Sequence, residues 1–353
     1  MLTEQSVREA VSQVRDPEIG RSLGELTMVR DIQVSGTSAK IGIELPTPAY
    51  PDRERITNAI KQAVTAQGAS AVDVDYSWAV RGKGTGGAIG LNVKNVIAVG
   101  SGKGGVGKST VAASLALGLK HFGAKVGLMD ADVYGPSIPH MVGASGKPAI
   151  KQIQLPDGRV MERIVPIEVD GMPTISMGYM VNPDQAVIWR GPMLHKALSQ
   201  FLQQTDWGTL DYLVIDMPPG TGDVALTLSQ MVGLAGAVVV CTPQQVALLD
   251  AVKAVSMFKT VKIPILGMVE NMTGEIFGRG GAKAKAEELG LAFLGEVPAN
   301  AMVREKGDAG QMAAIFQENT PTRDALLHMC QRVAIEVARS LMESPSLPTL
   351  EIL

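Results

Sequence analysis

The sequence predicts an α/β fold in which a doubly wound, mainly parallel sheet domain follows a small α+β domain. Three observations predict it. From residue 94 onward, short apolar runs alternate with helical segments, as in proteins whose buried parallel strands are joined by helices. The first 80 residues instead switch between a period of two and a helical period. Hydrophobic residues make up 46% of the 353 residues but aromatic residues only 4%, so the core consists mainly of aliphatic side chains.

Residues 1–80 are expected to form the small α+β domain. A helical pattern covers residues 3–14, and apolar residues then alternate at period two within residues 32–45, which indicates half-buried strands. A second helix is expected at residues 56–64, before a last strand. Residues 81–92 contain five glycines and almost nothing that could fill a core, so they predict a flexible linker.

Residues 93–345 are expected to form the large domain. In a doubly wound sheet, functional loops follow the carboxyl ends of the strands. Residues 150–180 lack a clear period and are expected to be an irregular insertion, and residues 346–353 a short tail. The predicted strands are Val96–Val99, Val126–Met129, Tyr212–Ile215, Ala237–Val240 and Ile265–Val269.

Charge and cysteine content exclude several classes of protein. A net charge of −3 disfavours nucleic acid as a partner, because nucleic-acid binders usually carry a basic stripe. The first residues lack a basic start followed by an apolar stretch, and no run approaches the roughly 18 apolar residues that span a bilayer. We therefore expect a cytoplasmic protein with no membrane partner. The two cysteines, Cys241 and Cys330, lie far apart in apolar patterns and are expected to pack in the core without forming a disulfide.

A glycine-rich segment carries the main chemical signal. It has the spacing G-x-x-x-x-G-K-[ST] between a predicted strand and a helical pattern at residues 111–121. In that context glycines let successive N–H groups point at a phosphate, Lys108 neutralises the β and γ oxygens, Ser109 binds Mg²⁺ and Thr110 reaches the α-phosphate. The predicted ATP-binding residues of this loop are Gly102, Lys103, Gly104, Gly105, Val106, Gly107, Lys108, Ser109 and Thr110.

Three aspartates at predicted strand ends complete the site. Asp216 ends the strand Tyr212–Ile215, where burying a carboxylate is costly unless it faces a cation, so it is expected to help bind Mg²⁺. Asp130 and Asp132 lie at alternating positions and would project to one side, toward Mg²⁺ and the attacking water. Asp130 is expected to bind Mg²⁺ and Asp132 to orient or deprotonate the water. Capping a helix is the alternative role for one of the two.

A second lysine, Lys103, precedes the Gly-Gly pair of the same loop. It lies too close within the loop to serve the same oxygens as Lys108 easily, and a solvated lysine is the alternative. The histidines are scattered without metal-ligand spacing and are expected to be ordinary surface or core residues. They are His121, His140, His195 and His328.

Several longer segments resemble one known family. KGGVGKST, DADVYGPSIP, DYLVIDMPPGTGD, TPQQVALLD and VENM together resemble the Mrp/ApbC branch of the MinD-like ATPases, which are regarded as iron–sulfur cluster carriers. DPEIG, LTMVRDI and LPTPAYP resemble the small metal–sulfur cluster assembly domain that often precedes this ATPase. The resemblance covers nearly the whole chain. It implies an ATPase that uses ATP and Mg²⁺ and transfers clusters to apoproteins, with apo iron–sulfur client proteins or cluster scaffolds as partners.

The resemblance also implies roles for particular residues. It implies a homodimer with ATP at the interface, in which Lys103 reaches the partner's nucleotide, so that catalysis depends on Lys103, Lys108 and Asp132. Asn271 is similar to the asparagine that contacts adenine in such proteins. Pro298 ends the stretch 295–298 that is similar to the one flanking the base.

The sequence departs from this family at its thiols. Members that carry a cluster usually have a C-x-x-C pair shortly after VENM, whereas this chain continues with Thr-Gly-Glu-Ile-Phe-Gly-Arg-Gly-Gly at residues 273–281. Tyr50 occupies the position at which the N-terminal domain commonly has a cysteine. The sequence therefore identifies no ligand for an iron–sulfur cluster.

Three functions of different classes stay open. The motifs favour a metallochaperone ATPase whose nucleotide state alters cluster uptake or release. The missing thiols favour a nucleotide-dependent scaffold that recruits partners without a cluster. A MinD-like positioning ATPase would need a basic amphipathic helix at its end, but residues 342–353 are short, interrupted by proline and not basic.

Overall fold

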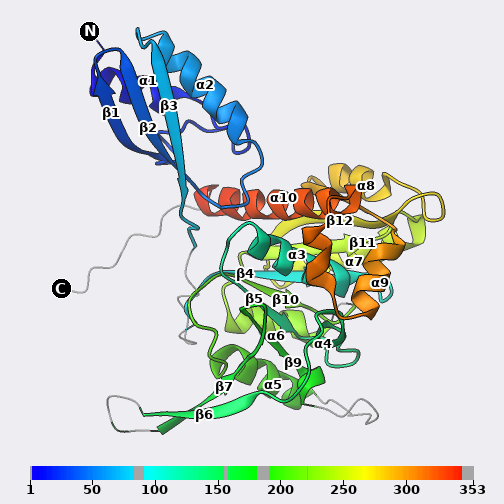
Figure 1. Ribbon diagram of the computed structural model, residues 1–353. Coiled ribbons are helices and arrows are strands. Elements are labelled where there is room, and N and C mark those ends of the chain that lie inside the picture. The colour runs from blue at the N-terminus through cyan, green and yellow to red at the C-terminus, as the bar shows by residue number, and fades with distance from the viewer. Residues whose placement is uncertain are drawn as a thin grey trace. The chain divides into compact units, whose positions relative to one another are not determined.

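The computed structural model describes residues 2–82, 91–154, 158, 160–180, 191–220 and 222–343, and these divide into two compact units (Figure 1). One unit consists of the described residues up to Arg81 together with those from Ala334 onward, and the other covers Gly82 to Val333. Residues 334–343 belong to the N-terminal unit, whereas the sequence predicts them in the large domain, and the large unit begins at Gly82, within the predicted linker. Most of the predicted linker and the predicted tail lie outside the described residues.

The N-terminal unit is a three-stranded sheet with two helices, in the order of elements that the sequence predicts. The central strand β2 is antiparallel to β1 and parallel to β3. Thr3 caps the first helix by accepting from the N–H of Ser6, and Asp52 caps the second by accepting from the N–H of Arg55. The elements are α1 (Glu4–Gln13), β1 (Val29–Ser35), β2 (Ser38–Leu45), α2 (Arg53–Thr65) and β3 (Ala71–Trp78).

The core of this unit is completed by a segment from the other end of the chain. Ile335, on helix α10 (Pro321–Glu343), is fully buried in the same cluster as Ile41, Ile56 and Ile60. The Arg339 guanidinium donates a hydrogen bond to the backbone carbonyl of Glu18. The small domain therefore depends on residues that follow it by more than 250 positions in the sequence.

The large unit contains an eight-stranded sheet in the order β13-β12-β11-β4-β10-β5-β9-β8. All neighbouring strands are parallel except β8 and β9, which confirms the predicted fold class. β4, β10 and β5 lie side by side at its centre, so their carboxyl ends meet at one edge. The central strands are β4 (Val93–Gly100), β5 (Val126–Asp130), β10 (Leu210–Asp216), β11 (Gly236–Cys241), β12 (Ile265–Thr273) and β13 (Phe293–Pro298).

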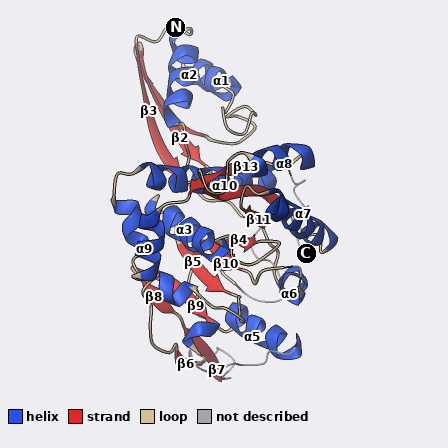
Figure 2. Cartoon of the chain, turned by 90° about the vertical axis from the view of Figure 1, so that its right-hand side faces the viewer, coloured by secondary structure: helices blue, strands red, loops and turns tan. Residues whose placement is uncertain are grey.

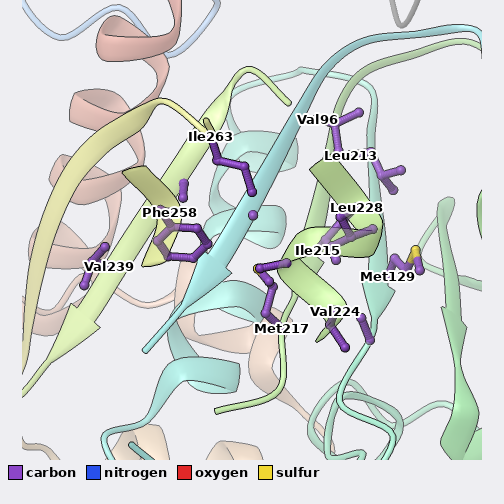
Figure 3. Close-up of a cluster of buried hydrophobic side chains, with 14 of the residues drawn as sticks. Val96, Met129, Leu213, Ile215, Met217, Val224, Leu228, Val239, Phe258 and Ile263 are labelled. Atoms are coloured by element: carbon purple, nitrogen blue, oxygen red, sulfur yellow. The ribbon is translucent and has the colours of Figure 1, made fainter. Parts of the chain in front are cut away.

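Helices cover both faces of this sheet, with α3 on one side and α6 on the other (Figures 1 and 2). α3 is buried almost all round, and the thiol of Cys330 on α10 lies 3.6 Å from the carbonyl oxygen of Ser114. On the opposite face Leu228 and Phe258 pack on strand residues such as Val239 (Figure 3). The helices are α3 (Lys108–His121), α4 (Ile138–Met141), α5 (Gly191–Gln203), α6 (Asp223–Met231), α7 (Gln245–Thr260), α8 (Gly281–Leu289) and α9 (Ala301–Asp308), with 3-10 helices at Met177–Tyr179 and Met312–Gln317.

The expectation of an irregular insertion at residues 150–180 is wrong. β6 (Ala149–Gln154) and β7 (Val160–Val165) form an antiparallel ribbon, and β8 (Ile167–Val169) and β9 (Met172–Ser176) extend the main sheet. β9 pairs in parallel with β5, although only five residues long. Because β9 is so short, its apolar residues show no clear alternation in the sequence. Pairing with β5, and not local propensity, therefore decides that it forms a strand.

Within the described residues, no helix is both long enough and apolar enough to cross a membrane.

Replacing Ile335 by alanine is expected to lower the free energy of unfolding of the N-terminal unit by about 2–5 kcal/mol, because it leaves a cavity in the core. Ile335→Val removes one methyl group and is expected to cost about 0.5–1.5 kcal/mol. Urea unfolding of the full chain, followed by hydrogen exchange of the β2 amides, measures both. Ile276→Ala, at a side chain that is 89% exposed, is the control. Unchanged β2 protection in Ile335→Ala would contradict the role of α10 in this core.

Candidate functional site

The glycine-rich loop joins the end of β4 to the start of α3, as predicted. Gly107 has φ 79° and immediately precedes the first residue of the helix, so the first free N–H groups of α3 face the loop. A side chain at Gly102 would lie 1.9 Å from the backbone oxygen of Asp250 on α7. The loop is therefore held against the neighbouring helix by close backbone approach, which only glycine permits.

Lys108, the first residue of α3, points inward and forms an ion pair. Its Nζ lies 2.6 Å from Oδ1 of Asp216 and 3.6 Å from Oδ2 of Asp132, and it also donates to the Ser109 hydroxyl at 3.2 Å. The lysine side chain is only 6% exposed. The buried ammonium group is therefore positioned by the end of β10, by the loop after β5 and by the start of α3.

Asp216 ends β10 and is fully buried. Burial raises the pKa of its carboxyl, while the Lys108 ammonium opposes that rise. Its second oxygen, Oδ2, is buried and has no hydrogen-bond partner among the described residues. An orphaned carboxylate oxygen beside a phosphate-type loop fits a cation or a cation-bound water as its partner.

Asp130 has a structural role in this arrangement. Its Oδ1 accepts from the N–H of Asp132 at 3.0 Å, and its Oδ2 accepts from the Ser176 hydroxyl at 2.9 Å and from the N–H of Ile138 at 3.3 Å. Burial, with the charge of Asp216, raises its pKa to about 8. Both oxygens are thus engaged in holding the loop between β5 and α4.

Asp132 has different surroundings from Asp130. Its Oδ1 accepts from the N–H of Gly135 at 3.2 Å, and its Oδ2 faces Lys108. Asp132 lines the pocket over the loop, whereas Asp130 does not. The two carboxylates therefore do not share one set of partners, and Asp130, unlike Asp132, accepts from the N–H group of the first residue of α4.

A pocket of about 790 Å³ lies over the loop. Lys103 lines it and makes no ion pair with the described residues. The structure brings most predicted site residues into its lining: Lys103, Gly104, Gly105, Gly107, Lys108, Ser109, Thr110, Asp132, Asn271 and Pro298. Sequence reasoning missed a further group of lining residues: Met272, which ends the VENM segment, and His140, Met141, Phe277, Asn300, Val303 and Arg304, which lie outside the quoted motifs.

Asn271 makes its side-chain contact with the glycine-rich loop. Its side-chain amide donates to the backbone carbonyl of Val106 in the loop, at 2.9 Å. It is buried, and a side chain at Gly107 would lie 2.2 Å from its Nδ2. Asn271 therefore packs directly on the phosphate-type loop.

The thiols do not fit an iron–sulfur cluster. Cys241 and Cys330 are both free and buried. Burial, with the charge of Glu270, raises the pKa of the Cys241 thiol to about 12, and burial also raises that of Cys330. Cluster ligation requires thiolates, which these surroundings disfavour. No group of three or more His, Cys, Asp or Glu side chains with metal-binding geometry occurs in the described part of the chain.

Tyr50, which stands where the N-terminal domain of relatives commonly has a cysteine, makes a buried hydrogen bond. The Tyr50 hydroxyl donates to Oδ2 of Asp16 at 2.8 Å, and Oδ1 of Asp16 accepts from the N–H groups of Glu18 and Ile19. Burial, with the charge of Asp16, raises the pKa of Tyr50. The turn is closed by polar contacts and offers no soft metal ligand.

A glycine-rich loop between a buried parallel strand and a helix, with a buried lysine paired to a strand-end aspartate, defines the class of P-loop NTPases. The family profile described as NUBPL iron-transfer P-loop NTPase matches residues 92–334, and the chain belongs to this family. A second profile, described as iron–sulfur cluster assembly protein, matches residues 4–75.

Relatives named iron–sulfur cluster carrier proteins match over nearly the whole chain. An iron–sulfur cluster carrier protein of Synechocystis sp. is 42% identical, over 97% of this chain and 100% of its own length. One of Deinococcus radiodurans is 43% identical, over 97% and 98%. The solved structure of a nucleotide-binding protein from Archaeoglobus fulgidus in complex with ADP is 34% identical, covers 66% of this chain and 91% of its own, and has a TM-score of 0.54.

Asp130→Asn is expected to flatten the pH dependence of stability of the nucleotide-free protein. The folded-state pKa of about 8 lies above the ordinary value of 3.8, so between these values the folded state keeps a proton that the unfolded state releases. Stability therefore falls as pH rises through this window and levels off above about pH 8. Urea unfolding at about pH 5 and about pH 8 with a chelator present measures the difference.

Asp73→Asn, at an exposed position on β3, is the matched control and should leave the slope unchanged. Equal slopes in wild type and Asp130→Asn would contradict the raised pKa.

Proposed function

We propose that this protein is an ATPase that acts in iron–sulfur cluster delivery, binding and hydrolysing Mg-ATP while clusters are passed to apoproteins. The observation that carries the ATPase part is the buried Lys108–Asp216 pair under the glycine-rich loop. The cluster part rests on family membership and on relatives named iron–sulfur cluster carrier proteins. We further propose that the protein acts in the cytoplasm, where two free cysteines would stay reduced.

Nucleotide binding would replace the carboxylate partners of Lys108 by phosphate oxygens. Its ammonium faces Asp216 and Asp132, and β and γ phosphate oxygens would offer it charge-assisted hydrogen bonds in their place. Residues 102–110 would surround the phosphates through backbone N–H groups and the Ser109 and Thr110 hydroxyls.

Ser109 and Asp216 are the proposed Mg²⁺ partners, because the hydroxyl lies beside Lys108 and the carboxylate has an unpartnered oxygen. The ion would neutralise charge on the phosphates. Asp130, which we expected beside the ion, would act by holding the β5–α4 loop. Asp132 would orient the attacking water, since it lines the pocket beside Lys108.

We propose that the protein forms a homodimer in which Lys103 of each chain reaches the nucleotide bound to the other chain. Lys103 lines the pocket, and its side chain makes no ion pair with the described residues, as expected of a group that would reach a second chain's nucleotide. Pro298 lines the same pocket at the end of β13, where we propose that the base lies. Hydrolysis would then require two chains, each completing the other's site.

The cluster is cargo that this chain's own thiols would not hold. Cys241 and Cys330 are buried with raised pKa values, so cluster ligands would come from the client or the cluster scaffold. The same observation favours a second candidate, a nucleotide-dependent scaffold that recruits partners through residues 1–80 and never carries a cluster.

Lys108→Ala is expected to weaken ATP binding by about 100-fold or more, because it removes the charge that faces the phosphates. Lys103→Ala should keep binding but lose about 10³-fold in turnover, as a group acting in the transition state would. Titration calorimetry and phosphate release measure the two effects. Lys61→Ala, at an exposed position on α2, is the control. Wild-type affinity in Lys108→Ala would contradict the loop assignment.

Anaerobic reconstitution with ferrous iron and sulfide tests whether the chain holds a cluster. We expect no retained iron and no absorbance near about 400 nm, because both thiols are buried as neutral groups. Repeating the experiment with an apo client protein and ATP then separates the two candidates. Nucleotide-dependent acceleration of client loading supports delivery, and its absence favours the scaffold. About one cluster retained by the protein alone would contradict the assignment of cargo ligands to other proteins.

A further inference from the structure

The end of β12 contains an irregularity beside the glycine-rich loop. Asn271 pairs with Val297 and Thr273 pairs with Pro298, so Met272 is an extra residue in the pairing with β13. Met272 has φ 60°, a left-handed conformation that residues with a β-carbon rarely adopt. A bulge with strained backbone, at the rim of a pocket, is the kind of feature that functional sites retain.

The bulge aims two consecutive side chains at the loop. In a regular strand neighbouring side chains point to opposite faces, but here both lie near Gly107. A β-carbon at Gly107 would be 2.2 Å from Nδ2 of Asn271 and 3.2 Å from the terminal methyl carbon of Met272. The Asn271 amide donates to the buried carbonyl of Val106 at 2.9 Å.

The strand end that bears these side chains is itself anchored. Glu270 is fully buried, and its carboxylate accepts hydrogen bonds from the N–H groups of Gly280, at 2.6 Å, and Ala282 at the start of α8. A carboxylate at a helix N-terminus is favoured by the unpaired N–H groups and the helix dipole. Residues 270–272 are therefore held at both ends. Glu270 is hydrogen-bonded to the start of α8, and Asn271 is hydrogen-bonded to the glycine-rich loop.

We propose that Asn271 is a positioning residue for the phosphate-binding loop, and that the bulge at Met272 is the device that directs it there. Its amide fixes the carbonyl of Val106, so the loop holds its phosphate-binding conformation before nucleotide arrives. This role concerns the phosphates and not the base, in contrast to the adenine contact expected from the family resemblance. The inference rests on the proposed function, in which this loop binds the phosphates of ATP.

Binding of three ligands that share phosphates but differ in base tests this role. Asn271→Ala is expected to weaken Mg-dependent binding of ATP, GTP and inorganic tripolyphosphate by the same factor, roughly tenfold, because the Val106 carbonyl loses its buried donor. Titration calorimetry on the full chain measures the three affinities. In nucleotide-free protein, hydrogen exchange should rise within residues 104–109. Asn58→Ala, at an exposed asparagine on α2, is the matched control and should change neither readout.

Two outcomes would overturn the inference: a loss confined to ATP, which assigns Asn271 to the base, and unchanged affinities with unchanged loop exchange. If Asn271→Ala does not fold, Asn271→Leu keeps a similar volume without the donor and is expected to give the same base-independent loss. Wild-type protein that binds none of the three ligands would contradict the proposed nucleotide binding. In that case loop exchange in the nucleotide-free variants still decides the role of Asn271.

Discussion

The ion pair between Lys108 and Asp216 is the interaction on which the site depends. Two charges this deeply buried are stable only when each faces the other, since removing either leaves an uncompensated charge in the core. Parallel pairing makes the encounter possible, because Asp216 lies level with Val99 of β4 and with Asp130 of β5. Lys108, the first residue of α3, reaches this edge of the sheet and pairs with Asp216.

Under the proposed function, this ion pair would also prepare the site for phosphates. Because Lys108 is buried and oriented by Asp216, an incoming phosphate would replace a carboxylate partner and not bulk water. The loop around it is fixed from two sides, by backbone approach to α7 at Gly102 and by the Asn271 amide at Val106. Preorganisation of this type favours binding because less conformational freedom is lost when the ligand arrives.

The described residues include a phosphate-type loop but no side chains arranged to bind an iron–sulfur cluster. The two thiols are core residues, and the turn that contains Tyr50 is closed by a hydrogen bond to Asp16. The N-terminal unit is nevertheless an integral part of the chain, since Ile335 from α10 lies in its core.

The sequence by itself determined the fold class, the loop at residues 102–110 and the strand-end acid Asp216, because apolar periodicity and glycine spacing are local properties. Only the tertiary structure decided the rest. Asp130 and Asp132 share a motif, yet their different neighbours, Ser176 and Lys108, separate a structural carboxylate from one that faces the pocket. The strand β9, the contribution of Ile335 and the contact of Asn271 with Val106 all depend on residues distant in sequence. Such pairings are fixed by packing and hydrogen bonding across the fold, which no local pattern of residues encodes.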